Sequence, residues 1–112
     1  MDLIVRAAKL GEEVNNKFIE VAKGSKVIGE VRGKGLMIGL ELVKNKRTRE
    51  PVTKLPEIVK KIREQGVISM FCGRHLNVLR LMPPLVISRT LFDKAIDIVL
   101  YVLKENEADL MK

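Results

Sequence analysis

Arg80 is the residue whose type and setting most clearly suggest chemistry in this chain. It lies inside the apolar segment 78–82, directly before Pro83-Pro84. A guanidinium group in an otherwise apolar strand needs a partner, because burying an unpaired charge is costly. One candidate partner is a carboxylate of the same domain, such as Glu30 or Glu41. The other is a substrate carboxylate, which arginine binds through two parallel hydrogen bonds, and the spacing alone leaves both open.

A second candidate is the glycine-rich segment in which Gly33-Lys34-Gly35 is followed by Gly39. A dinucleotide-binding loop needs the pattern GxGxxG at the start of a helix, whereas here the third glycine comes one residue late and a strand follows. A Walker loop needs Ser or Thr after its lysine, and Lys34 is followed by Gly35. The spacing therefore favours a structural role for Gly33 and Gly35, as a tight bend with close backbone approach at the entry to a strand.

Cys72 and His75 have the CxxH spacing of some metal ligands, and they are the only cysteine and the only histidine in the chain. A structural zinc site takes four ligands, and no second pair exists. A Cys–His nucleophile pair needs a third group that orients the base, and the sequence offers no candidate for it. We therefore predict no metal site and interpret both residues as ordinary loop residues.

Composition is typical of a small globular protein. The chain has 112 residues, of which 46% are hydrophobic, so it suffices for one domain with its own core. No apolar run approaches the roughly 20 residues of a membrane helix, and the first residues lack the apolar segment of a signal peptide. A single cysteine excludes an internal disulfide. We expect no membrane contact and a cytoplasmic setting.

The net charge is +7, and much of the excess lies between residues 44 and 63. Clustered Lys and Arg can neutralise phosphates, which suggests nucleic acid as a partner. Aromatic residues make up only 4% of the chain, however, and the basic segment has none on which bases could stack. We interpret this segment as a solvated loop and the outer face of a helix. A basic α/β module that binds nucleic acid or a protein partner is the alternative.

Three stretches have the apolar spacing of amphipathic helices. The first covers residues 2–23 and ends at Gly24-Ser25, and the second ends at Gly66. The third begins at an N-cap formed by Ser88, or at a variant capping box of Thr90 with Asp93. Residues after 105 are expected to fray. The predicted buried faces consist of Leu3, Ala7, Leu10, Val14, Phe18 and Val21, then Leu55, Ile58, Val59 and Ile62, and finally Phe92, Ala95, Ile96, Val99, Leu100 and Leu103.

The remaining segments have the pattern of strands. Residues 27–43 are predicted to be extended, with apolar residues alternating from Leu36 to Leu42. Residues 67–71 and 77–82 form an antiparallel pair around a loop, and the prolines end the second strand. The element order α-β-α-β-β-α predicts an α/β (α+β) two-layer sandwich, in which a small, mostly antiparallel sheet has helices on one face. Residues 1–112 would form one domain, with a leading helix at 1–24 and the α/β core at 25–112.

Two segments together resemble the end of class III aminotransferases, pyridoxal-phosphate enzymes of fold type I that include 4-aminobutyrate, ornithine and acetylornithine aminotransferases. The first reads GEVRGKGLM at 29–37, with Gly39 and Glu41-Leu42 following; the second reads NVLRLMPPL at 77–85. AAKLGE at 7–12 also resembles the helix that leads into their small C-terminal domain. The resemblance covers nearly the whole chain, and the combination is specific although either motif alone is weak.

The resemblance implies a fold and a set of roles. The fold would be that small C-terminal domain, and the parent reaction would transfer an amino group between an amine or amino acid and a 2-oxo acid. Arg80 matches the arginine that binds the substrate carboxylate in several members, or that pairs with an acidic residue of the large domain. Arg32 would be mainly structural, holding the turn and the domain contact together with Gly33, Gly35, Pro83 and Pro84. The resemblance leaves open which amine reacts and whether the chemistry is transamination, racemisation, decarboxylation or amino-group migration.

The resemblance also implies what this chain lacks. In the family, the Schiff-base lysine, the aspartate facing the pyridine nitrogen and the phosphate-binding loop belong to the large domain. We therefore expect the chain to carry no catalytic residue, to bind no pyridoxal phosphate alone and to be inactive alone. Its expected partner is a large cofactor-binding domain or subunit. An apolar surface left uncovered would favour self-association into oligomers.

Overall fold

The structure is a computed structural model and describes residues 2–83 and 87–112. Pro84, for which we predict a structural role, lies outside the described residues. The elements follow in the order α1 (Leu3–Gly24), β1 (Ile28–Lys34), β2 (Met37–Asn45), β3 (Glu50–Pro51), α2 (Leu55–Glu64), β4 (Met70–Cys72), β5 (Val78–Leu81), α3 (Arg89–Glu105) and α4 (Glu107–Leu110).

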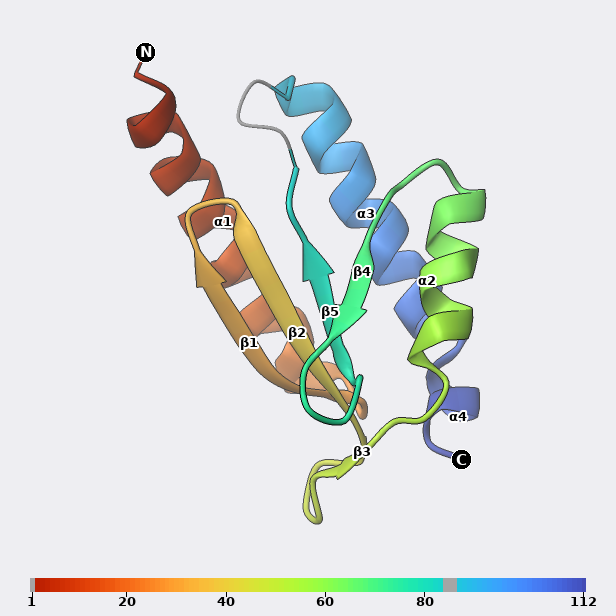
Figure 1. Ribbon diagram of the computed structural model, residues 1–112. Coiled ribbons are helices and arrows are strands. Elements are labelled where there is room, and N and C mark those ends of the chain that lie inside the picture. The colour runs from red at the N-terminus through yellow and green to blue at the C-terminus, as the bar shows by residue number, and fades with distance from the viewer. Residues whose placement is uncertain (1, 84–86) are drawn as a thin grey trace.

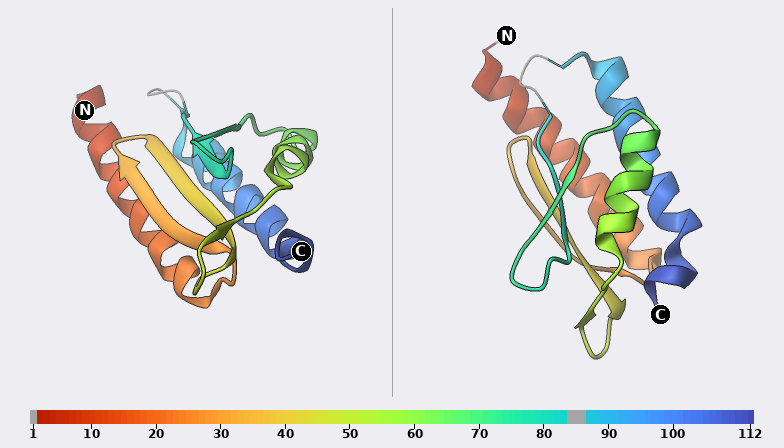
Figure 2. Two further views of the ribbon diagram at one scale, coloured as in Figure 1. Left: turned by 60° about the horizontal axis from the view of Figure 1, so that its bottom comes forward. Right: turned by 45° about the vertical axis from the view of Figure 1, so that its right-hand side comes forward.

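The strands form one antiparallel sheet in the order β1-β2-β5-β4, and the short β3 pairs with the end of β2. In Figure 1, α1 and α3 lie behind the sheet, and α2 lies beside β4. Figure 2 shows the same arrangement from two further directions, with α2 next to α3 in both. The predicted mixed α/β architecture with a small antiparallel sheet and helices is confirmed.

Several predicted boundaries differ from the structure. The predicted single extended segment 27–43 is a hairpin, because the chain reverses at Gly35, whose φ is +59°. The predicted strand 67–71 begins only at Met70, and the residues after 105 form the short helix α4 around a buried Leu110. The first hairpin strand carries no regular apolar alternation, so the pattern from Leu36 onwards revealed only its second strand.

The core lies between the sheet and the helices. Ile38, Leu40 and Leu42 of β2 are at most 1% exposed, which confirms the predicted alternation. Most residues of the predicted helix faces are buried. Leu3 and Val21, near the two ends of α1, are exposed, and Val59, Ala95 and Leu100 are half-buried. Of the two predicted starts for the last helix, the Ser88 cap is present: its Oγ accepts a hydrogen bond from the backbone N–H of Leu91.

Helix α1 packs directly against the tip of the β1–β2 hairpin. A Cβ atom at Gly11 would lie 1.9 Å from the carbonyl oxygen of Gly35, far inside van der Waals contact. One turn further along the helix, a Cβ at Gly33 would lie 2.9 Å from Oδ1 of Asn15. Gly33 thus lies where the helix comes close to the hairpin, and Gly35, with its positive φ, lies where the chain reverses.

Replacement of Gly11 by alanine should therefore destabilise the chain by at least about 2 kcal/mol, because backbone must move to admit the methyl group. Gly24→Ala is the matched control: it also lies in α1, and a Cβ there has nothing within 4 Å. Its free energy of unfolding should stay within about 1 kcal/mol of the wild type or rise, as alanine favours a helix. Urea unfolding measures both values. Equal stability of the two variants would contradict the close helix–turn contact.

Candidate functional site

Arg80 lies in a row of residues that crosses the sheet on the face away from α1 and α3. Arg32 of β1 pairs with Gly39 of β2, Gly39 pairs with Arg80 of β5, and Arg80 pairs with Met70 of β4. Residues directly opposite one another in antiparallel strands share one face of a sheet. The two arginines therefore flank a position that has no side chain.

The two arginines and the glycine between them line a hollow of about 440 Å³, which we call the arginine trough. Three of its lining residues are glycines, so part of its lining is backbone without side chains. The lining residues are Arg32, Gly33, Met37, Ile38, Gly39, Cys72, Gly73, Val78 and Arg80.

Asn77 sets the position of Arg80 in this row. Its side chain is buried, and its Nδ2 donates a 2.9 Å hydrogen bond to the carbonyl oxygen of Leu42. The backbone N–H of Leu42 donates in return to the carbonyl oxygen of Asn77 at 2.8 Å. These two bonds hold the start of β5 against β2, and the alternation of the strand then turns Leu79 and Leu81 into the core and Arg80 outward.

Arg32 belongs to a network of two arginines and two glutamates. Its Nη2 donates to Oε2 of Glu41 at 2.6 Å and to Oε2 of Glu30 at 3.0 Å. Arg49 adds ion pairs of 3.3 Å with Glu41 and 3.6 Å with Glu30. The hydrogen bond and the charge of Arg32 lower the pKa of Glu30, and Glu30 in turn raises the pKa of Arg32. The charge of Arg32 is therefore largely compensated within the domain.

Arg80 has a different environment. Glu30 and Glu41, the two domain carboxylates considered as its partners, bind Arg32 and Arg49 instead. Within residues 2–83 and 87–112, Arg80 forms no hydrogen bond or ion pair, and it is exposed. These contacts leave Arg80 available to a carboxylate from outside this domain. The substrate-binding role of Arg80 stays a prediction.

The remaining residues singled out in the sequence lie at the margins of this face. Cys72 ends β4 and lines the trough, whereas His75 is exposed in the following turn. Among the described residues, no group of three or more His, Cys, Asp or Glu side chains could hold a metal ion. Pro83 is half-buried and borders a second, apolar hollow. The sequence drew attention to Gly39 as part of a possible phosphate loop and of the family motif, but it did not reveal that Gly39 lies between the two arginines.

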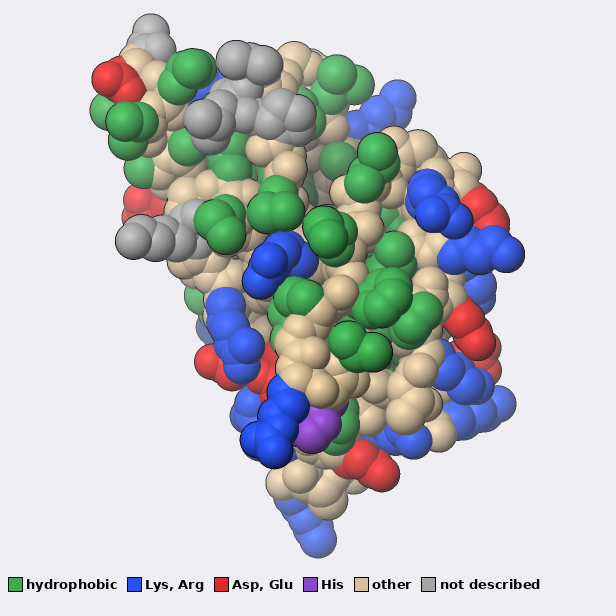
Figure 3. Space-filling view, viewed as in Figure 1, with side chains coloured by type: hydrophobic (Ala, Val, Ile, Leu, Met, Phe, Trp, Pro, Cys, Tyr) green, Lys and Arg blue, Asp and Glu red, His purple; other side chains and the backbone are tan. Residues whose placement is uncertain are grey.

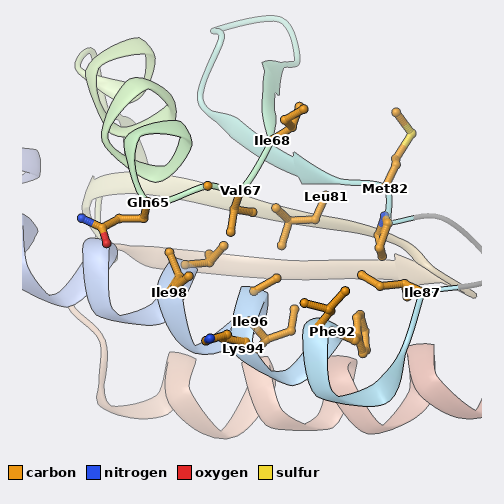
Figure 4. Close-up of a pocket in the computed structure, with 15 residues that line it drawn as sticks. Gln65, Val67, Ile68, Leu81, Met82, Ile87, Phe92, Lys94, Ile96 and Ile98 are labelled. Carbon is orange, nitrogen blue, oxygen red and sulfur yellow. The ribbon is translucent and has the colours of Figure 1, made fainter.

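The second hollow, which we call the apolar groove, has a volume of about 550 Å³ and lies between α3 and the segments that lead into β4 and out of β5 (Figure 4). Its rim is strongly exposed: Ile68 is 84% exposed, Leu91 59% and Met82 50%. Figure 3 shows hydrophobic side chains gathered over the centre and upper part of this side of the molecule. The lining residues are Gln65, Gly66, Val67, Ile68, Leu81, Met82, Pro83, Ile87, Leu91, Phe92, Lys94, Ala95, Ile96, Ile98 and Val99.

The described residues do not fit pyridoxal phosphate. A Schiff-base lysine needs a pocket that lowers its pKa by burial or by neighbouring cations. No lysine whose side chain the structure describes is buried, and the one lysine that lines the apolar groove, Lys94, is exposed. In the same described part of the chain, no helix has the length and apolar character needed to cross a membrane.

Comparison with known proteins gives one consistent result. The family model described as aminotransferase class-III matches residues 1–103. The chain is 34% identical over 99 residues to 4-aminobutyrate aminotransferase of Escherichia coli K12, which covers 88% of this chain and 23% of that enzyme. It is 35% identical over 105 residues to alanine/serine racemase of Pyrococcus horikoshii, covering 94% of this chain and 22% of the racemase.

A solved structure agrees with these sequence matches. An aminotransferase of Bacillus anthracis superposes on the chain with a TM-score of 0.83 at 32% identity, over 92% of this chain and 24% of that one. The chain thus spans about a quarter of the length of the relatives it matches.

We expect the ion network to make the stability of the chain depend on pH. Because Arg32 lowers the pKa of Glu30 below its ordinary value of 4.5, the contribution of this pair is present above that pH and is lost as the pH falls through the lowered value. In Arg32→Met, the pKa of Glu30 should rise toward its ordinary value, as followed by carboxyl carbon NMR. The difference in unfolding free energy between wild type and variant should shrink between pH 6 and pH 3.

Lys17→Met is the control for this prediction, because it removes an exposed ion pair with Asp97 on the helices and leaves the network intact. It should not change the pKa of Glu30. A stability difference between wild type and Arg32→Met that is independent of pH would contradict the assigned pairing.

Proposed function

The chain belongs to the class III aminotransferase family, and from this premise we propose that it is the small domain of a pyridoxal-phosphate-dependent enzyme whose Arg80 binds the carboxylate of the substrate. One observation carries this proposal. Arg80 is an exposed cation beside a hollow, while the carboxylates of its own domain bind other arginines. A ligand can therefore bind this arginine without breaking an ion pair among the described residues of the domain.

The chemistry assigned to Arg80 is recognition and orientation. A planar guanidinium offers two parallel N–H groups to a carboxylate, which fixes the direction of the substrate as well as its position. Pyridoxal phosphate acts as the electron sink in this family, and the protein supplies orientation and electrostatics. The amine or amino acid that reacts would therefore carry a carboxylate, and a 2-oxo acid would accept the amino group.

The cofactor residues are proposed to lie outside this chain. The chain corresponds to about a quarter of its relatives, and the lysines described in it have no pocket suited to a Schiff base. We propose that a large cofactor-binding domain or subunit in the cytoplasm supplies them. The chain alone would neither bind pyridoxal phosphate productively nor transfer an amino group.

The apolar groove and the first turn of α1 are the proposed contact surface for that partner. Leu3, Ile4 and Val5 are between 45% and 78% exposed, and Arg6 donates a hydrogen bond to the carbonyl oxygen of Ile87 in the segment before α3. That bond joins this first turn to Ile87, which lines the apolar groove. The beginnings of α1 and α3 lie at the same end of the molecule (Figure 1). Exposed apolar surface of this extent marks a site of association in soluble proteins.

Racemisation is the second candidate activity, because an amino acid racemase is among the relatives. The role of Arg80 would be the same in both reactions, since in each the carboxylate of an amino acid would be held while bonds change at the carbon that bears its amino group. Transamination is distinguished by its dependence on a 2-oxo acid, and racemisation by inversion of the amino acid without one.

A chimera tests the role of Arg80. In 4-aminobutyrate aminotransferase of Escherichia coli, this chain replaces the region that it matches. Arg80→Met should lower kcat/KM for the carboxylate substrate by about 100-fold, chiefly through KM, because a charge-assisted bidentate contact is lost. Arg80→Lys should lie in between, since it keeps the charge but loses the planar fork.

Arg74→Met is the matched control in that chimera, because Arg74 is an exposed arginine of the neighbouring turn and does not line the trough. Borohydride reduction followed by peptide mass spectrometry confirms that each chimera holds its cofactor. The same treatment of the 112-residue chain alone should label lysines only sparsely. One stoichiometric lysine adduct in the chain alone would contradict the assignment of the cofactor site to a separate domain.

Self-association of the isolated chain is a separate prediction. With the apolar groove uncovered, sedimentation should show dimers or larger species, and Ile68→Lys should shift the chain toward monomer. Ile68 is 84% exposed, so this change should leave the fold intact. Tyr101→Lys, at an exposed position outside the groove, should associate like the wild type. A wild-type monomer at high concentration would count against this surface.

A further inference from the structure

Gly39 is a glycine that neither the backbone nor the packing requires. Gly35 has a positive φ, and a Cβ at Gly11 would collide with backbone, so both have a structural reason to be glycine. Gly39 lies in the middle of β2, and its φ is outside the left-handed region. A Cβ there would lie 3.5 Å from Cγ1 of Val78 and 3.9 Å from the carbonyl oxygen of Arg32, which is ordinary contact.

Glycine at such a position carries a cost. Within a strand it loses more conformational freedom on folding than any other residue and offers no side chain to pack. A glycine in a strand interior often marks a place where a ligand or another backbone comes close to the main chain. The surroundings of Gly39 indicate which of these applies.

The residues opposite Gly39 in the two adjacent strands are both arginines, and they differ in whether a carboxylate binds them. Arg32 is held by Glu30 and Glu41, whereas Arg80 has no partner among the described residues. An anion that enters the trough therefore meets one available guanidinium, and it reaches that group across the bare backbone of Gly39. Met37 and Val78 provide apolar surface on the same hollow for the carbon chain of a ligand.

We propose that Gly39 is a specificity-determining residue: its missing side chain keeps open the approach to Arg80 and leaves room in the trough for the carbon chain that carries a carboxylate. This rests on the proposed carboxylate-binding role of Arg80 and deepens it. A methyl group at position 39 would lie in the trough between the two arginines and take the space of one carbon of the ligand. A larger aliphatic side chain there would fill the gap and cover Arg80.

The test is a titration of the full chain, with 15N-labelled arginine, by 2-oxoglutarate and by propionate at low ionic strength. The Nε–H signal of Arg80 should shift saturably in the wild type. Gly39→Ala should weaken binding about tenfold, the usual effect of one carbon in a fitted site, and Gly39→Leu should weaken it more. Gly24→Ala is the control and should bind like the wild type, since a Cβ there has nothing within 4 Å.

Thermal unfolding separates this role from a structural one. The unfolding midpoint of Gly39→Ala should be no lower than that of the wild type, because alanine restricts the unfolded chain and meets no clash in the strand. A variant that binds weakly while folding at least as stably is the expected result. A lower midpoint for Gly39→Ala would instead assign the glycine to packing and would overturn the proposal.

Other outcomes also decide the question. Unchanged carboxylate binding by Gly39→Leu, or no saturable shift in the wild type, would overturn the role of Gly39. An equal response to sulfate would show an adventitious ion only and would overturn it too. If Arg80→Met abolishes binding while the Gly39 variants bind normally, this inference fails and the proposed function stands. If Arg80→Met leaves the chimera fully active, the proposed function itself fails.

Discussion

The register between β2 and β5 is the constraint on which the site depends. A shift of one residue would turn every side chain of β5 to the other face, so that Arg80 would enter the core and Leu79 and Leu81 would face solvent. The buried leucines oppose such a shift through their burial, and the two hydrogen bonds between Asn77 and Leu42 oppose it through geometry. The position of a surface arginine is thus set by interactions that lie almost entirely beneath it.

The two arginines of the trough differ because the carboxylates of the sheet lie beside Arg32 and not beside Arg80. Glu41 is only 16% exposed at its side chain and lies on β2 beside the strand of Arg32, so it binds Arg32 and, across the hairpin end, Arg49. No carboxylate of the described chain lies in the row beyond Gly39. Exposed ion pairs contribute little to stability, and their greater effect here is to compensate Arg32 and leave Arg80 as the available cation.

The helices could be predicted because their patterns involve residues only a few positions apart. The arrangement of the strands could not, because strand pairing joins residues that are distant in the sequence. The stripe of α2 and the cap at Ser88 depend on residues a few positions apart, and both are visible in the sequence. Arg80 stood out because a charged residue interrupts an apolar strand. The hairpin at Gly35 was missed because β1 lacks alternation. The row that joins Arg32, Gly39 and Arg80 could not be predicted, since it exists only after three strands pair in one register.

The domain is well packed on one side and incomplete on the other. Behind the sheet, the core is closed by α1 and α3, while the opposite face carries the arginine trough and the exposed side chains of Met37 and Met70. A surface that combines exposed apolar residues with an uncompensated cation is poorly suited to water alone. It is suited to a site at the interface between this domain and a second domain or subunit. Apolar contact at such an interface excludes water, which strengthens the attraction between the cation and a bound carboxylate. The division of labour in the proposed enzyme follows from this: one body holds the reactive cofactor, and this one aligns the charged end of the substrate.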